Sequence, residues 1–284
     1  MIRQHFYSVT ARQGKPFLSR SPWRHIVVIV LAAVWGAGSG LADSSSLPDL
    51  RDLTLTNWDC LHKPEGAARD AAHVSRNRMK NRDWVAVTGT NVPQWDYAQF
   101  IDHARAFDVE LGARFRTNLT HEAESKLASI ENRVVSLKGW MVLTYPGPPE
   151  SCNCNSAEFH DWHIEVVQTP LNHAPTIGDP TAIICEITPR TEAALYRAGV
   201  RVQKLAEFMD LGKPPNIVTH ATGSAPHQVR ITGYLMWDDQ HNVSGTDVGP
   251  TIERGGNGQY RHPWRVTAWE IHPILQIEDL GPAK

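Results

Sequence analysis

The sequence lacks the short motifs that mark several large enzyme classes. It has no Gly-x-Ser-x-Gly, which excludes the nucleophile elbow of α/β-hydrolases. It also has no His-Glu-x-x-His, no glycine-rich dinucleotide fingerprint and no Gly-Lys-Ser/Thr, so the zincin, Rossmann and P-loop signatures are absent. Any chemistry must therefore come from residues that folding brings together.

Acidic residues are absent from the first 24 positions, whose basic residues are Arg3, Arg12, Lys15, Arg20 and Arg24. An apolar run, 25–35, and small residues ending at Ala42 follow. This order is typical of a secretory signal, so we expect 1–42 to be removed and the mature chain to reach the periplasm or the extracellular space. The alternative is an uncleaved membrane anchor over 25–42, and only then do we expect membrane contact.

Removal of this segment makes the chain acidic. It carries five of the 28 Lys and Arg residues and none of the 30 Asp and Glu residues, so the formal charge falls from −2 to −7. A chain with this balance does not bind phosphate backbones by bulk electrostatics. Nucleic acid is therefore not an expected partner.

Cysteine is scarce, with four residues: Cys60, Cys152, Cys154 and Cys185. Export permits disulfides, and we expect Cys60 to pair with Cys152 or Cys154. Cys185 falls on the inward side of a predicted strand and is expected to be a buried free thiol. The alternative for Cys152 and Cys154 is a zinc site completed by His160 or His163.

Three helices are predicted in 43–132, over 64–82, 94–107 and 121–132. This part is expected to be a helical extension or linker. The basic residues at the end of the first helix suit the helix dipole; they are Arg76, Arg78, Lys80 and Arg82.

From 133 to 284 the apolar period changes to two, which predicts a β domain. The expected strands are Val134–Tyr145, Phe159–Val167, Thr181–Thr188, Val229–Trp237 and Arg265–Ile277. A helix is predicted over Thr191–Met209, between the third and fourth strands.

The order β-β-β-α-β-β resembles that of the OB fold, a five-stranded Greek-key barrel. The first and fourth strands also share a Val-x-apolar-x-Gly-aromatic pattern, from Val135 to Trp140 and from Val229 to Tyr234. A mid-strand glycine marks a bulge or a sharp bend. The resemblance covers about half of the chain and implies a mainly β protein with a helical N-terminal extension. A β-sandwich with an inserted helix is the structural alternative.

Acid-x-His occurs twice, as Asp161 with His163 and as Glu270 with His272. On a strand these residues share one face, while Trp162, Ile164, Val166, Trp269 and Ile271 take the other. Glu186 of the third strand is expected on the acid and histidine face. The candidate catalytic residues are Asp161, His163, Glu186, Glu270 and His272.

Three interpretations of this face stay open. A divalent metal such as zinc would be held by Asp161, His163, Glu270 and His272 and would activate water. Without a metal, the same groups would serve in acid–base catalysis. The third interpretation is that they are solvated or mutually hydrogen-bonded pairs on an ordinary outer face.

A ligand groove is predicted beside the barrel, because Arg190, Arg261, His262 and Trp264 fall near its expected edge. Three functions are consistent with these observations. The first is an exported binding protein for an unidentified ligand. The second is a metal-dependent hydrolase of the phosphodiesterase or nuclease kind, and the third is a structural protein of the cell envelope.

Overall fold

The computed structural model describes residues 50, 52–89, 91–170, 179–198, 209–211, 220–222, 227–243, 247–248, 253–254, 260–261 and 263–282. All of them belong to the second of the two compact units into which the chain divides, Ser45–Lys284. The predicted signal or anchor segment, 1–42, lies outside the described residues, as does His262. Within the described part, no helix combines the length and apolar character needed to cross a membrane.

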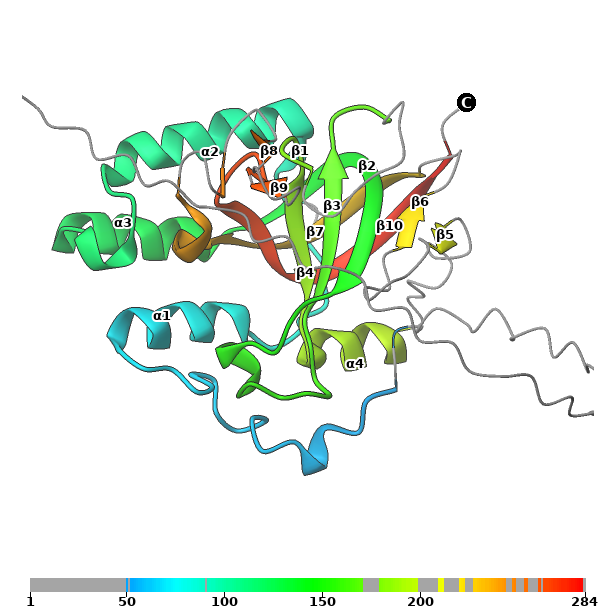
Figure 1. Ribbon diagram of the computed structural model, residues 1–284, viewed down its shortest axis with the longest axis horizontal. Coiled ribbons are helices and arrows are strands. Elements are labelled where there is room, and N and C mark those ends of the chain that lie inside the picture. Colours follow the sequence, from blue (N-terminus) through cyan, green and yellow to red (C-terminus); the bar gives the residue numbers. More distant parts are fainter. Residues whose placement is uncertain are drawn as a thin grey trace, which may run out of the picture. The chain divides into compact units, whose positions relative to one another are not determined.

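Five strands close into a barrel (Figure 1). They are β2 (Val134–Pro146), β3 (Trp162–Val167), β4 (Ile183–Ile187), β7 (His227–Trp237) and β10 (Trp269–Pro282). They pair in the order β3-β4-β10-β7-β2, and pairing of β2 with β3 closes the ring. β4 and β10 run parallel, whereas the other neighbours are antiparallel. The five predicted strands are thus present.

Shorter strands add to this sheet. β1 (Gln94–Asp96) pairs in parallel with β2, and β6 (His220–Thr222) pairs with β2 and with β5 (Met209–Leu211). β8 (Glu253–Arg254) and β9 (Tyr260–Arg261) form a separate two-stranded sheet.

The described α-helices are α1 (Ala71–Lys80), α2 (Tyr97–Leu111), α3 (His121–Glu131) and α4 (Pro189–Arg197). Each begins after a polar residue whose side chain accepts a backbone N–H of the first turn; these are Asp70, Asp96, Thr120 and Thr188. Short 3-10 helices are η1 (Leu55–Asn57), η2 (Arg116–Asn118), η3 (Ser151–Asn153) and η4 (Asp239–His241).

Three of the helix predictions were wrong in their bounds. The first helix begins at Ala71 and not near residue 64, because Asp70 caps it there. The helix predicted over 94–107 begins at Tyr97, after the cap residue Asp96, and ends at Leu111, because Gln94–Asp96 form β1. The helix predicted over Thr191–Met209 ends at Arg197, and Met209 instead opens a strand. The remaining residues of that predicted helix, 199–208, lie outside the described part of the chain.

The barrel interior holds the side chains that were predicted to point inward. Trp162, Ile164 and Val166 of β3 are buried there with Trp237 and Trp269. α2 and α3 lie along one side of the barrel (Figure 1) and add apolar side chains to the same cluster. These include Phe100, Ile101, Phe107, Leu127 and Ile130. Two helices of the predicted extension, α2 and α3, therefore pack into the same hydrophobic core as the barrel strands.

The glycine of β7 lies opposite an irregularity in the pairing with β10. A Cβ atom on Gly233 would lie 2.4 Å from the carbonyl oxygen of Pro273. The register of β10 shifts opposite this glycine, between Ile271 and Ile274. Close backbone approach at Gly233 thus accommodates a bulge in β10 directly after His272.

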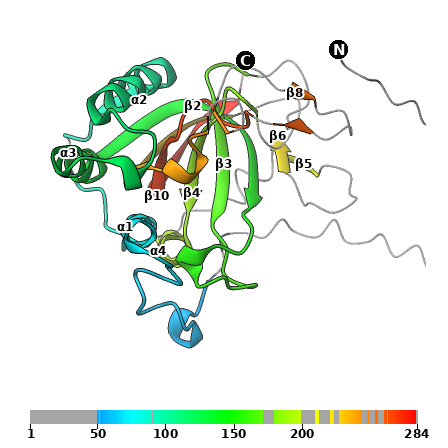
Figure 2. The same ribbon diagram turned by 60° about the vertical axis from the view of Figure 1, so that its left-hand side comes forward.

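Residues 53–82 form what we call the covering segment. It contains η1 and α1; α1 packs against β10 and η3, and η1 packs against α4. Figure 2 shows α1 and α4 beside each other on the same side of the barrel. A disulfide joins Cys60 to Cys154 of the turn after β2, as one of the two expected pairings, and leaves Cys152 and Cys185 as buried free thiols.

Arg190 of α4 also anchors the covering segment, in addition to the disulfide. Its guanidinium donates to Asn81 Oδ1 at 2.5 Å and to the carbonyl oxygen of Cys60 at 2.7 Å. It also lies 4.8 Å from the ring centre of Trp58. Asn81 in turn donates to the carbonyl oxygen of Cys152 at 2.8 Å. The segment is therefore held at both ends.

Reduction of the disulfide should lower the free energy of unfolding by about 2–4 kcal/mol, because a cross-link over a long loop restricts the unfolded chain. The two cysteines are 94 residues apart. Urea denaturation with and without dithiothreitol measures the change. A Cys60→Ser/Cys154→Ser variant is the control, since its stability should not respond to the reductant. An unchanged wild-type midpoint after complete reduction contradicts the prediction.

Candidate functional site

Strand pairing places the predicted acids and histidines side by side. His163 of β3 is the register partner of Glu186 of β4. Cys185 pairs with Ile271 across β4 and β10, so the residues that follow them, Glu186 and His272, are also neighbours. Because side chains alternate along a strand, these residues leave the barrel on the face opposite to its core.

This outer face is closed to solvent. Asp161, Glu270 and His272 have no accessible surface, and Glu186 and His163 keep only 1% and 7%. The pairs are therefore not solvated, because other parts of the chain cover the face. The other form of that interpretation, a mutual hydrogen bond, is met by Glu270 and His272 at 3.0 Å. With its neighbours this face forms what we call the buried polar cluster: Lys80, Glu150, Cys152, Asp161, His163, Glu186, Asp238, Arg265, Glu270 and His272.

Glu186 lies between the two histidines. Its Oε1 atom is 3.1 Å from Nε2 of His163, and its Oε2 atom is 3.0 Å from Nδ1 of His272. Each oxygen of one carboxylate thus faces a different imidazole. Glu186 is therefore the residue that links the histidine of β3 with the histidine of β10.

The two nitrogens of His272 have different surroundings. Nδ1 lies 3.0 Å from Glu270 Oε1, and Arg265 donates to the other oxygen of Glu270 at 2.5 Å. Nε2 makes no hydrogen bond to any described residue, and the nearest carboxylate oxygen in an ion pair with it is Asp161 Oδ2, at 3.6 Å. When the ring is neutral, the Glu270 contact favours the tautomer with its proton on Nδ1, which leaves the lone pair of Nε2 free. In the charged imidazolium Nε2 also carries a proton, which a metal ion would have to displace.

The turn after β2 positions Asp161. Asn153 donates to Asp161 Oδ1 at 2.8 Å, and the thiol of Cys152 lies 3.5 Å from Asp161 Oδ2. Cys152 also lies 3.4 Å from Glu150 Oε2. One turn of 3-10 helix therefore brings a thiol and a second carboxylate to the edge of the strand face.

Lys80, from the last turn of α1, completes the cluster. Its Nζ atom is 2.8 Å from Glu150 Oε2 and 3.7 Å from Glu186 Oε2. Only 5% of its side chain is exposed. The basic end of this helix was predicted to serve the helix dipole, whereas the structure directs Lys80 into a buried acidic site.

The cluster has an excess of acidic groups. Its carboxylates are Glu150, Asp161, Glu186, Asp238 and Glu270, against the fixed cations Lys80 and Arg265. Arg76 of α1, which is also buried, acts on Asp238 as a third cation. Five acids and three cations leave two negative charges when all are ionised, and protonation of both histidines neutralises them. A buried excess of negative charge favours binding of a proton or a metal cation.

The pKa values follow from this balance. Burial alone would lower the pKa of His272, but the carboxylates of Glu186 and Glu270 raise it to about 10. Burial, reinforced by Glu150, raises the pKa of Asp161 to about 6. Burial would raise the pKa of Glu186, yet His163 and Lys80 hold it well below its usual value. The cluster therefore retains protons on histidine at neutral pH.

Three sets of side chains offer ligand atoms that lie within 4.8 Å of one another. The sets are Asp161, Glu186 and His272; Glu150, His163 and Glu186; and Glu150, Cys152 and Asp161. The structure thus brings together all five predicted catalytic residues. These sets differ from the predicted metal ligands. Glu186, which faces both histidines, belongs to two of them, whereas Glu270 belongs to none and contacts Nδ1 of His272.

Sequence reasoning missed Lys80, Glu150 and Arg265 as members of the cluster. Lys80 lies in a helix and Glu150 in a turn, so neither belongs to the strand pattern that revealed the other residues. Arg265 is fully buried between Asp238 and Glu270 and lies before β10 begins, although the predicted strand started there.

The predicted groove residues are only partly gathered. Arg190 is buried and fastens the covering segment. Trp264 donates to Asp247 Oδ1 at 3.2 Å and packs on a small apolar cluster outside the barrel. Arg261 belongs to β9, and His262 lies outside the described residues. The ligand groove therefore stays a prediction.

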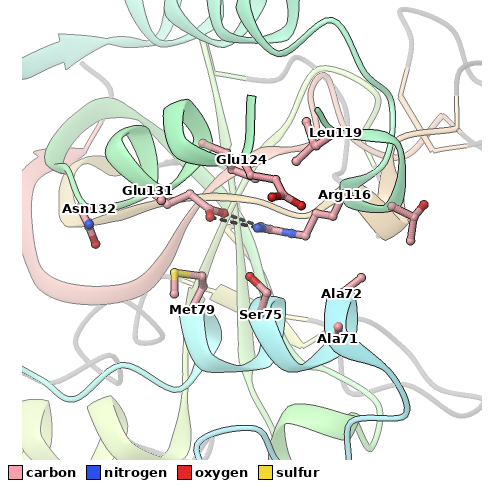
Figure 3. A pocket seen from close by; sticks show the side chains of 12 residues that line it. Ala71, Ala72, Ser75, Met79, Arg116, Leu119, Glu124, Glu131 and Asn132 are labelled. Carbon is pink, nitrogen blue, oxygen red and sulfur yellow. Dashed lines mark hydrogen bonds and ion pairs between the residues drawn. The ribbon is translucent and has the colours of Figure 1, made fainter. Parts of the chain in front are cut away.

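A cavity of about 590 Å³ lies between α1 and α3 (Figure 3). Arg116 and Glu131 form an ion pair across it, with a hydrogen bond of 3.0 Å from Nη1 to Oε2. Arg116 also donates to Asp239 Oδ1 at 3.1 Å. None of the residues lining this cavity belongs to the buried polar cluster.

Comparison of the chain with protein-family models, curated proteins and solved structures gives no match.

The stability of the protein should fall as the pH rises from about 7 to 10 in buffer containing a chelator. The folded state holds the proton of His272 up to a pKa of about 10, whereas the ordinary value is 6.5. Unfolding in this range therefore releases a proton, so the stabilisation present below pH 6.5 is lost as pH rises. Urea denaturation at stepped pH measures the free energy of unfolding.

A His272→Gln variant should lose most of this decline, and His121→Gln, which removes an exposed histidine of α3, should keep it. A wild-type decline that the His272→Gln variant shares in full contradicts the assignment.

Proposed function

We propose that the protein is an exported binding protein whose ligand is a divalent transition-metal ion, held by Asp161, Glu186 and His272. The observation that carries the proposal is the state of His272 Nε2. This atom is fully buried, forms no hydrogen bond with the described residues and faces Asp161 Oδ2 at 3.6 Å. A buried polar atom without a partner is costly, and a bound ion would remove that cost.

The spacing of these two atoms suits two ligands of one ion. A separation of 3.6 Å is too long for a hydrogen bond. Ligand bonds of about 2.0–2.1 Å around a tetrahedral zinc ion place neighbouring ligand atoms about 3.3–3.4 Å apart. A small adjustment of either side chain would therefore admit an ion between them.

The partners behind His272 also support the proposal. Metal-bound histidines usually donate their other N–H to a carboxylate, which fixes the tautomer and the ring orientation. Glu270 takes this position at 3.0 Å from Nδ1, and Arg265 orients Glu270 at 2.5 Å. The predicted ligand Glu270 thus becomes a positioning residue.

Zinc is the ion that the donor set favours. Imidazole nitrogen and carboxylate oxygen suit zinc and its neighbours in the first transition row. The thiol of Cys152, 3.5 Å from Asp161 Oδ2, adds a soft donor that calcium and magnesium do not prefer.

We propose further that the barrel is of the OB type and that the chain is exported. The closed order β3-β4-β10-β7-β2, with one parallel pair and α4 between β4 and β7 in the chain, supports the first point. The basic leader with its apolar run supports the second, and the Cys60–Cys154 disulfide is typical of an oxidising compartment.

The closed form of the site favours a bound structural ion over hydrolysis. Catalytic zinc sites keep one position open to water or substrate. Here Asp161 and His272 have no accessible surface, so a substrate would first have to displace the covering segment. Hydrolysis of a phosphodiester and a structural role in the envelope stay predictions.

The purified protein, prepared without affinity metal, should bind one zinc ion per chain. Elemental analysis and calorimetric titration after chelation measure the stoichiometry and the affinity. His272→Gln and Asp161→Asn should each weaken zinc binding by more than about 100-fold. Loss of a residue that only hydrogen-bonds to a metal ligand already lowers metal affinity by about 10- to 100-fold. Glu270→Gln should weaken it by about 10-fold for that reason.

His121→Gln is the matched control, because this histidine is exposed on α3 and lies next to Glu124. It should bind zinc like the wild type. A folded wild-type protein that binds no zinc, cobalt or manganese contradicts the proposal and leaves the cluster as a self-compensated ion network.

A further inference from the structure

We infer that the buried polar cluster contains two cation positions bridged by the carboxylate of Glu186, and that the ammonium group of Lys80 fills the second position. This inference rests on the proposed function, because the first position is the metal site of Asp161, Glu186 and His272. The second position is formed by Glu150, His163 and Glu186, whose ligand atoms lie within 4.8 Å of one another.

Each oxygen of Glu186 faces one of the two histidines. Oε1 lies 3.1 Å from His163 Nε2, and Oε2 lies 3.0 Å from His272 Nδ1. Paired metal ions in proteins lie about 3.5–4 Å apart, a distance that the two oxygens of one carboxylate can bridge. Glu186 Oε2 accepts no hydrogen bond from the described part of the chain, although it is buried. It forms ion pairs with His272 Nδ1 at 3.0 Å and with Lys80 Nζ at 3.7 Å, so its surroundings are those of a cation site.

A cation already occupies the second position. Nζ of Lys80 lies 2.8 Å from Glu150 Oε2 and 3.7 Å from Glu186 Oε2, so it contacts both carboxylates of the set. Only 5% of its side chain is exposed, so its ammonium group is surrounded by these two carboxylates and has little contact with water. A divalent ion at the same place would be repelled by the ammonium charge at short range in a poorly screened interior.

The backbone leaves room for His163 at this position. A Cβ atom on Gly147 would lie 2.4 Å from Cε1 and 2.8 Å from Nδ1 of the imidazole. The amide of Gly147 donates to the carbonyl oxygen of Asp161 at 2.7 Å, which holds the turn against β3. Glycine at 147 therefore permits the close approach that sets the ring of His163 beside Glu186.

Lys80 thereby becomes the residue that determines how many ions the site accepts. It belongs to α1, within the covering segment, whereas both sets of ligands belong to the barrel and its turn. With Lys80 in place the cluster takes one divalent ion. Without its charge, the Glu150, His163 and Glu186 set takes a second divalent transition-metal ion.

The test is the zinc stoichiometry of a Lys80→Met variant of the full chain, which keeps most of the side-chain volume and removes the charge. The expected result is two zinc ions per chain, against one for the wild type. A Lys80→Met/Glu150→Gln variant, which removes a ligand of the second position, should return to one ion. Lys126→Met on α3 is the control for loss of a lysine that pairs with a glutamate, and should bind one ion.

The outcomes separate the two proposals. A wild type that binds no ion overturns the proposed function. A wild type that binds one ion, together with a Lys80→Met variant that also binds one, overturns the second position alone. If Lys80→Met is unfolded in chelator, its refolding is followed by circular dichroism during zinc addition. Refolding complete at two equivalents supports the inference, and refolding at one equivalent or none overturns it.

Discussion

The burial of the Glu186 carboxylate is the constraint on which the rest of the site depends. A carboxylate removed from water costs several kcal/mol unless opposite charges and hydrogen bonds surround it. His163, His272 and Lys80 supply those charges from β3, β10 and α1. The elements that cover the barrel face therefore also balance its charge. Removal of β3, β10 or α1 would expose the Glu186 carboxylate or leave it without an opposite charge.

The covering segment connects this electrostatic balance to the fold. It brings Lys80 to the face, and the Cys60–Cys154 disulfide and Arg190 hold it there. Under the proposed function, an ion would enter or leave the closed site only when this segment moves away, and its exchange would be slow. A closed site with nitrogen and oxygen ligands is typical of structural metal binding.

The strands and half of the site could be predicted from the sequence, because both depend on alternation. Acid-x-His on β3 and on β10 repeats the period of a strand, and the barrel order places these strands on either side of β4. Alternation separates two faces, but it does not reveal whether the second face is open or covered. Lys80 and Glu150 come from a helix and a turn distant in the chain, and only tertiary packing places them beside Glu186.

Anomalous diffraction from crystals of the protein grown with zinc tests the central claim most directly. Data collected on both sides of the zinc absorption edge locate the ion without assumption about its ligands. The account predicts a peak at about 2.0–2.2 Å from His272 Nε2 and from an oxygen of Asp161, with Glu270 still bonded to Nδ1. A peak elsewhere, or no peak and a direct hydrogen bond between His272 Nε2 and Asp161, would contradict it.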